Sequence, residues 1–379
     1  MAGTFVAFDL ILFFVFWELV LIPMYFLIAI WGSGNREYAA IKFFLYTLLG
    51  SVFMLLGFLG MFFLSHPHTF EIPALQRFGA GGGFTHPAAL LLFGAVFLGF
   101  AVKVPMWPFH TWLPDAHTEA PTVGSVLLAG ILLKMGGYGF IRIAFGILPN
   151  GARTWAPAIA VLGGIAIVYA SLACLAQRDL KRLIAFSSVG HMGFVMLGIA
   201  TMTTVGVNAA VFAMVAHGII TGLLFFEVGS IYDRFHTRQI ADFGGLVKKL
   251  PHLGWVFAAT AIASLGLPPL PGFWGEILAM FGAFHPGLGL SVALFRTVMV
   301  FAGIGTILTS GYFLWTIQRV GYGVVPERWR DTRIRDLLPV EWASWGPLLA
   351  GLLAVAVWPA IVFGVTNDAV SALTKLFGS

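Results

Sequence analysis

Two lysines lie inside two of the most apolar stretches of this 379-residue chain. Lys103 occurs in GAVFLGFAVKVPMWPFH and Lys134 in GSVLLAGILLKMGGYGF. An isolated charge at the centre of a lipid bilayer costs about 2.5 to 3.5 kcal/mol on insertion scales, so such residues usually have a function there. Because an amine can release and regain a proton, the two lysines predict proton movement.

Two carboxylates lie in similar surroundings, Glu18 in VFWELVLIP and Glu276 in PGFWGEILAM. Forming or breaking an ion pair, such as Glu18 with Lys103, would change how tightly the lysine holds its proton. Such a lysine would be a switchable proton carrier. The alternative is a fixed ion pair that locks two helices together.

Four histidines are further candidates for proton transfer because histidine titrates near neutral pH. His110 and His117 are seven residues apart, so on one helix they would share a face. His191 and His217 are single histidines in apolar stretches, and either could join a water chain from the lysines to Glu276. A purely structural role is the alternative for each. A metal site is disfavoured because these histidines are dispersed, without a compact cluster of carboxylates or cysteines.

The composition indicates a membrane protein whose helices cross the bilayer several times. Hydrophobic residues make up 59% of the chain and charged residues 10%, whereas soluble proteins have about 25% charged residues. The single cysteine, Cys174, excludes an internal disulfide and any multi-cysteine metal or iron–sulfur site. The chain is apolar from Phe5 to Ile30, which favours a first membrane span over a cleaved signal peptide. We therefore expect an all-α, polytopic bundle that forms one membrane domain over residues 1–379.

Ten apolar windows are long enough to cross about 30 Å of hydrocarbon. They cover residues 5–30, 39–64, 89–118, 122–147, 155–175, 183–204, 206–232, 251–284, 290–318 and 341–364. The third and eighth windows are too long for one straight helix, and each contains paired prolines, in 104–108 and 266–272. Proline removes a backbone donor, and such breaks persist in lipid only where they face protein or water. Both windows therefore predict discontinuous helices.

The two broken spans are five apart in the count, so the chain enters them from opposite sides of the membrane. This spacing favours two inverted repeats with a site at each break. Residues 1–147 would form a partial first repeat, 155–318 the second repeat and 341–364 a terminal helix. Two unrelated proline kinks are the alternative, which we disfavour because each break lies near a buried charge.

Loop charges predict the orientation, because cytoplasmic loops of membrane proteins are rich in lysine and arginine. The loops on one side hold only Arg77, Arg153 and Lys375. The loops on the other side hold Arg36, Arg178, Lys181, Arg182, Arg234, Arg238, Lys248, Lys249, Arg319, Arg328, Arg330, Arg333 and Arg335. The richer side is predicted to be cytoplasmic and both ends of the chain to face away from it. The net charge of +5 then reflects topology and does not indicate nucleic-acid binding.

A consecutive series of motifs resembles a known family. The series is FWELVLIPMYFLIAIWG, FAVKVPMWPFHTWLPDAHTEAPT, GSVLLAGILLKMGGYG, DLKRLIAFSSVGHMGF and IYDRFHTRQI. From about Phe5 to Phe363 the chain resembles the subunit M family of bacterial NADH:quinone oxidoreductase, respiratory complex I, and chain 4 of the mitochondrial enzyme. It is similar, more distantly, to subunits of Mrp-type sodium/proton antiporters and membrane-bound hydrogenases.

The resemblance implies fourteen helices with two inverted five-helix repeats, each holding a half-channel. It implies Glu18 as the ion-pair carboxylate, Lys103 as the central lysine of the broken helix, Lys134 as the connecting lysine and Glu276 as the outlet carboxylate. The family's polar-axis histidines would correspond to His110, His117, His191 and His217.

The implied function is proton translocation coupled to electron transfer in other subunits. NADH, flavin, iron–sulfur clusters and quinone would belong to those partners, and this chain would hold no cofactor, since it has no glycine-rich nucleotide motif and no cysteine cluster. The expected partners are membrane and peripheral subunits of complex I, including paralogous antiporter-like subunits, within a bacterial inner membrane. The alternatives are a sodium/proton antiporter or hydrogenase subunit without this partner enzyme, and a truncated structural subunit that conducts no protons.

Two departures from the family pattern accompany the resemblance. Glu18 would belong to the family's fifth helix, so we expect the first four helices to be absent from this chain. Glu227, in GLLFFEVGSIYDR, stands where the family usually has an apolar residue. Because polar residues follow five positions later, we expect Glu227 to extend to the edge of the membrane; an extra proton-path group is the alternative.

Overall fold

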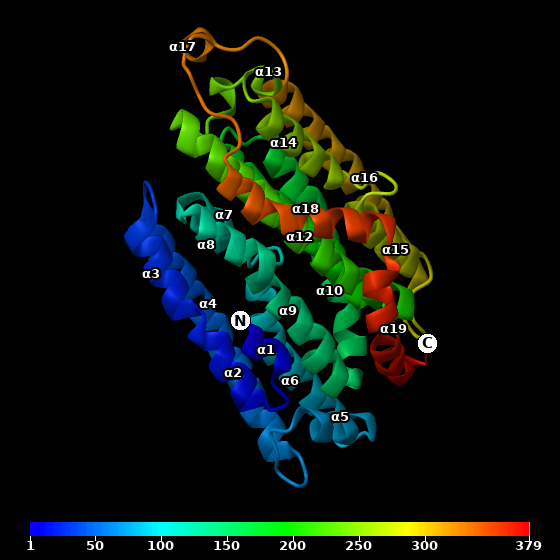
Figure 1. Ribbon diagram of the computed structural model, residues 1–379. Coiled ribbons are helices and arrows are strands. Elements are labelled where there is room, and N and C mark those ends of the chain that lie inside the picture. Colours follow the sequence, from blue (N-terminus) through cyan, green and yellow to red (C-terminus); the bar gives the residue numbers. More distant parts are fainter. Residues whose placement is uncertain (379) are drawn as a thin grey trace.

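A computed structural model describes residues 1–378 as an elongated bundle of helices (Figure 1). Within these residues β-structure is limited to two isolated bridges, and no strand forms. Helices dominate because a helix satisfies its own backbone hydrogen bonds, which lipid cannot do. The predicted all-α fold is confirmed.

The first part of the chain contributes nine α-helices and two π-helical segments. These are α1 (Ala2–Val6), α2 (Leu10–Leu19), α3 (Leu21–Trp31), α4 (Arg36–Leu64), α5 (Ile72–Ala80), α6 (His86–Lys103), α7 (Trp112–Glu119), α8 (Thr122–Leu127), η1 (Leu128–Leu132), α9 (Leu133–Gly139) and η2 (Phe140–Phe145).

The second part continues with long helices and with short helices in the loops. These are α10 (Pro149–Leu175), α11 (Leu180–Ala200), α12 (Thr204–Phe235), η3 (Ile240–Asp242), α13 (Leu246–Lys249), α14 (Pro251–Ala263), α15 (Pro271–Phe284), α16 (Val292–Thr316), η4 (Ile317–Gly321), α17 (Glu327–Arg330), α18 (Pro339–Val357), α19 (Ala360–Thr374) and η5 (Lys375–Phe377).

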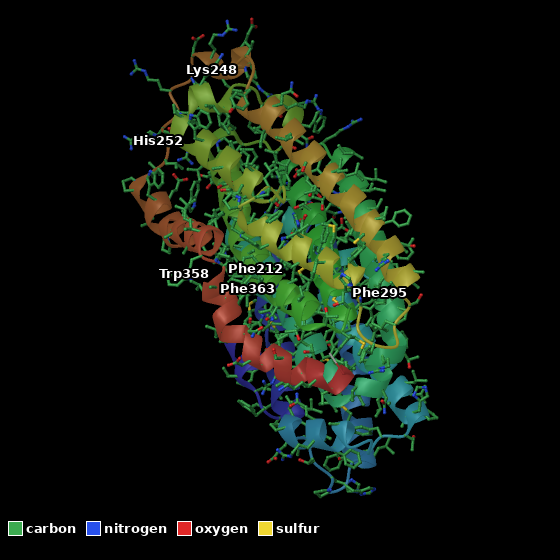
Figure 2. All side chains as sticks on the ribbon, turned by 90° about the vertical axis from the view of Figure 1, so that its right-hand side faces the viewer. Phe212, Lys248, His252, Phe295, Trp358 and Phe363 are labelled. Carbon is green, nitrogen blue, oxygen red and sulfur yellow. The ribbon has the colours of Figure 1, made fainter. Side chains whose placement is uncertain are left out.

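Ten helical segments within residues 1–378 are long and apolar enough to span a membrane, in agreement with the predicted count. The predicted spans and the spans in the structure differ near the C-terminus. The predicted window 251–284 is divided between α14 and α15, and the predicted helix 341–364 is divided between α18 and α19. Pro359 separates the latter pair, since proline cannot donate a backbone hydrogen bond. Trp358 lies at this bend, and Phe363 of α19 stacks on Phe212 of α12 at 4.8 Å between ring centroids (Figure 2).

The two predicted helix breaks are present, between α6 and α7 and between α14 and α15. In each break a side chain from another helix donates a hydrogen bond to a backbone carbonyl that has lost its helical partner. The Trp112 indole donates to the Val102 carbonyl at 2.9 Å, and the Ser310 hydroxyl donates to the Leu265 carbonyl at 3.2 Å. These bonds replace the lost helical ones, which is what allows irregular backbone at this depth.

The same local structure occurs once at each end of the bundle. The Asp9 side chain caps the start of α2, and its backbone forms an isolated β-bridge with Glu71. In the same way, the Asp179 side chain caps the start of α11, and its backbone forms an isolated β-bridge with Gln239. The first bridge lies beside α5 at the lower end, and α13 and α17 lie at the upper end (Figure 1). This arrangement agrees with inverted repeats.

Candidate functional site

Lys134 and His217 are in direct contact, although they lie 83 residues apart in sequence. Lys134 Nζ lies 2.6 Å from His217 Nδ1 and also donates to the Ala129 carbonyl in η1. Both side chains are buried. When the lysine is charged, Nδ1 must accept, so His217 then holds its own proton on Nε2.

The close approach of two helices makes this contact possible. On α12, Gly218 follows His217, and a Cβ atom at Gly218 would lie 2.9 Å from the carbonyl oxygen of Gly130 in η1. Only glycine permits that separation without moving the backbone. The π-helical turn of η1 precedes Lys134, and such turns occur often at functional sites.

His191 and Glu276 form a second contact, between α11 and α15. His191 Nδ1 lies 3.1 Å from Glu276 Oε1, and His191 Nε2 lies 2.9 Å from the Ser264 hydroxyl. Thr306 donates to the other Glu276 oxygen at 3.0 Å. With Glu276 ionised, every bond has one donor and one acceptor if His191 carries its proton on Nδ1.

The break between α14 and α15 also shapes the surroundings of Glu276. Gly266 has a φ of +73°, and a Cβ there would lie 2.9 Å from Glu276 Oε2. A larger residue would therefore be strained and would press on the carboxylate. The broken helix thus brings its backbone directly against the acidic group.

A small cavity joins the two contacts. It has a volume of about 20 Å³ and is lined by His191, His217, Ser264 and Glu276. The His191 and His217 ring centroids are 5.6 Å apart, and no described residue bonds to His217 Nε2. A water needs about 10–15 Å³ of such space and two or more polar partners, so this cavity suits one water molecule.

Lys103 and Glu18 occupy a separate region at the end of α6 and in α2. Lys103 is 1% exposed, and its Nζ lies 4.8 Å from the centre of the Trp17 ring. Among residues 1–378, Lys103 Nζ and Glu18 Oε1 are both buried without a hydrogen-bond partner. No ion pair within 4.0 Å joins these two described residues, although the Glu18 charge acts on Lys103. The two groups are therefore near each other but not bonded.

The prediction that His110 and His117 share one helical face is wrong. His110 lies in the break before α7, and its ring packs on Tyr169, whereas His117 lies in α7 and stacks on Phe225 at 4.6 Å. The paired prolines end α6 before His110, so no continuous helix holds both. His117 is nevertheless close enough to Lys134 for the lysine charge to act on it.

Glu227 is buried inside the bundle and does not extend out of it, so that expectation is also wrong. Its exposure is 0%, and Thr260 of α14 donates to its Oε1 at 2.6 Å. Its position near polar residues in sequence was misleading because α14 and α18 cover this side of α12. Lys181, which the charge pattern assigns to a loop, is likewise buried in the first turn of α11 and donates to the Ala120 carbonyl.

Lys134 also borders a groove of about 1190 Å³ between α9, α12 and α19. Its lining is mainly apolar, and its charged residues are Arg77, Lys134 and Arg142. The lysine thus lies between this groove and His217. Within residues 1–378, no group of three or more His, Cys, Asp or Glu residues is arranged to hold a metal ion.

Comparison with known families and sequences gives a consistent result. Residues 7–302 match the family described as NADH:quinone oxidoreductase/Mrp antiporter, TM. The chain is 46% identical to NADH-quinone oxidoreductase subunit M of Rhodobacter capsulatus, covering 99% of this chain and 73% of that protein. It is 42% identical to NADH-quinone oxidoreductase subunit M of Rickettsia bellii, with coverage of 99% and 73%.

Solved structures show the same fold. A chain of respiratory complex I from Thermus thermophilus with bound NADH is 30% identical, with a TM-score of 0.90, and the match covers 98% of this chain and 76% of that one. A chain of the Mrp complex from Dietzia is 22% identical, with a TM-score of 0.84 and coverage of 99% and 76%. The latter likeness concerns the fold alone.

Proposed function

Since the chain belongs to the NADH:quinone oxidoreductase/Mrp antiporter family of membrane subunits, we propose that it translocates protons as subunit M of a bacterial respiratory complex I. The observation that carries this proposal is the series Lys134, His217, a cavity for one water, His191 and Glu276. Four titratable groups from four helical segments meet there, deep in an apolar bundle.

The proton would move through this series in steps between neighbouring atoms. Lys134 passes a proton to His217 Nδ1, and His217 releases another from Nε2 to the water. That water passes a proton to Glu276 directly or through His191, and Glu276 then releases it on the side opposite the basic loops. Thr306 remains bonded to Glu276 and holds the carboxylate in place.

Lys103 would take up protons from the cytoplasmic side and pass them through water and His117 to Lys134, the first residue of this series. Neither Lys103 Nζ nor Glu18 Oε1 has a hydrogen-bond partner among the described residues, which supports a changeable interaction over a fixed ion pair. Glu18 is half-buried and lies between the exposed residues Val15 and Leu19 of α2, so the charge of a neighbouring subunit could reach it. A change in that charge would alter how strongly Glu18 attracts the Lys103 proton.

Electron transfer would take place in other subunits of the assembly. NADH, flavin, iron–sulfur clusters and quinone would be bound there, and this chain would supply only the proton path. The protein would then reside in the bacterial inner membrane with other antiporter-like subunits. Purification in mild detergent is expected to yield quinone-reductase and iron–sulfur subunits; recovery of antiporter subunits alone would instead assign the chain to a sodium/proton antiporter.

Replacement of Lys134 tests the proton path. Lys134→Ala removes the only amine that contacts His217 among residues 1–378, so proton pumping is expected to be lost or strongly lowered while the chain still inserts. The measurement is the number of protons pumped per NADH oxidised in inside-out vesicles. Lys248→Ala is the matched control, because Lys248 is exposed in the upper loop region (Figure 2). An unchanged ratio in Lys134→Ala would reject the proposed path.

A further inference from the structure

Glu227 is a buried carboxyl group that the path above does not use. It lies in α12 with 0% exposure, and its Oε1 accepts from Thr260 at 2.6 Å. Its Oε2 has no hydrogen-bond partner, and no lysine, arginine or histidine forms an ion pair with it, within residues 1–378. Burying a carboxylate without a cation is costly, and the single hydrogen bond from Thr260 offsets little of that cost. A purely structural role for Glu227 is therefore disfavoured. A carboxyl in this setting can instead hold and release a proton.

The contacts on its inner side lead to the site already described. Thr260 lies in α14 and Ser264 caps the end of this helix four residues later, so their hydroxyls lie on one face, about one turn apart. The Ser264 hydroxyl is 2.9 Å from His191 Nε2, and His191 Nδ1 is 3.1 Å from Glu276. One face of α14 therefore leads from Glu227 to the His191–Glu276 pair.

The contacts on its outer side lead to the end of α12 that carries the basic loops. Ser230 and Arg234 follow Glu227 by three and seven residues and share its helical face. Both bond to Glu341 of α18, and Arg234 Nη2 lies 2.6 Å from Glu341 Oε2. The Arg234 and Glu341 side chains are 10% and 16% exposed, so this cluster reaches the surface of the bundle.

We propose that Glu227 is a second proton-loading residue, which supplies the His191–Glu276 pair from the cytoplasmic rim without passing through Lys103 or Lys134. The inference rests on the proposed function and adds a branch to it. The rim cluster of Ser230, Arg234 and Glu341 forms its outer end.

The proposed branch moves the equivalent of one proton from Glu227 to Glu276, and no bond to carbon forms or breaks. Protonated Glu227 donates to Thr260 Oγ1, whose own hydroxyl proton passes through one water to Ser264. Ser264 donates its proton to His191 Nε2, and His191 gives its Nδ1 proton to Glu276. This step leaves Glu227 ionised and Glu276 protonated. Glu227 then regains a proton from the rim, Glu276 releases the proton it received, and rotation of the hydroxyls with return of the histidine tautomer restores the starting state.

The test replaces Glu227 by its uncharged isostere in the assembled complex. Glu227→Gln keeps an acceptor for Thr260 but cannot release a proton, so the protons pumped per NADH should fall while NADH oxidation per assembled complex continues. Thr260→Val and Ser264→Ala should lower the same ratio, and Glu227→Asp should restore part of it. Thr316→Val is the control, since this buried hydroxyl donates to the Tyr312 carbonyl at 2.7 Å and lies on α16.

Two further measurements make the outcome decisive. Infrared difference spectra during turnover should show a carboxyl band that disappears in Glu227→Gln, which a structural hydrogen bond would not produce. Glu276→Gln in the same vesicles tests the site itself. A lowered ratio in Glu276→Gln with an unchanged ratio in Glu227→Gln would overturn this inference alone, whereas unchanged ratios in both would also reject the proposed function. Loss of assembled complex at an unchanged ratio would likewise make Glu227 structural.

Discussion

Incomplete bonding distinguishes several of the buried titratable residues from the ion pairs near the surface. Lys103 Nζ, Glu18 Oε1, His217 Nε2 and Glu227 Oε2 are buried and have no hydrogen-bond partner within residues 1–378. An unsatisfied buried polar atom costs about 1–3 kcal/mol, and native proteins rarely keep one without a reason such as water or a functional role. Lys42 and Asp115, by contrast, pair at 2.7 Å. The unpaired atoms therefore indicate groups that change partners.

His217 provides a test at the scale of one residue. His217→Gln keeps a polar group beside Lys134 but cannot pass a proton between two ring nitrogens. Because a positioned acid–base group typically contributes a factor of about 10²–10⁴, we expect the pumping rate to fall by about 100-fold or more. The measurement is the rate of vesicle acidification at matched NADH oxidation. His285→Gln, at an exposed position after α15, should leave the rate unchanged; an equal rate in both variants would exclude His217 as a relay.

At the scale of elements, interruptions of regular helix structure provide the site. The break before α15 brings Gly266 against Glu276, and the π-helical segment η1 supplies the Ala129 carbonyl to Lys134. The contact of α12 with η1 at Gly218 and Gly130 then fixes the position of His217 beside the lysine. A shift of α12 would separate these groups even if every titratable residue remained.

The substitution Gly218→Ala tests this contact. The new Cβ would lie 2.9 Å from a backbone oxygen, so α12 must move, at a cost of about 1–3 kcal/mol for overpacking. We expect a lower thermal unfolding midpoint and reduced pumping. Gly311→Ala in α16 is the matched control, since a Cβ atom there would meet open space beyond its own helix backbone and sequence neighbours among the described residues, and alanine favours helices. Equal midpoints in the two variants would contradict the close packing.

At the scale of the whole molecule, the segment 322–338 connects α16 to α18 across the upper end of the bundle (Figure 1). Asp336 in this segment accepts hydrogen bonds from the backbone N–H groups of His252 and Leu253, which begin α14. Arg234 of α12 donates to the Arg335 and Asp336 carbonyls. The segment thus holds together the upper ends of α12 and α14, the two helices that carry Glu227 and Thr260.

The pH dependence of stability should report this connection. Burial raises the pKa of Asp336, but donors from His252, Leu253 and Leu337 outweigh burial and hold the pKa below its usual value. A lowered folded-state pKa stabilises the protein above the unfolded value of about 3.9, and this stability is lost as the pH falls further. We therefore expect Asp336→Asn to lower the thermal unfolding midpoint at neutral pH. We also expect the midpoint of this variant to fall less steeply than that of the unchanged protein as the pH is lowered. Asp331→Asn, an exposed change in the same segment, should do neither.

The sequence by itself determined the class of the protein, most of its spans and its two helix breaks. Long apolar runs and paired prolines act locally, because a backbone in lipid must bond within its own segment. Lys103, Lys134 and Glu276 could be singled out for the same reason, since a charge in an apolar run is costly wherever the neighbouring helices lie. The consecutive motifs led to the family.

Only the tertiary structure decided which of these groups meet. The contacts of Lys134 with His217 and of His191 with Glu276 join residues 83 and 85 positions apart. Helices that are apolar on every side, such as α12, give no periodic signal of which face is buried. For that reason the sequence placed Glu227 at the membrane edge and His110 on one helix with His117. The packing of α12 against α14 and α18, and the end of α6 at its break, determined their actual positions.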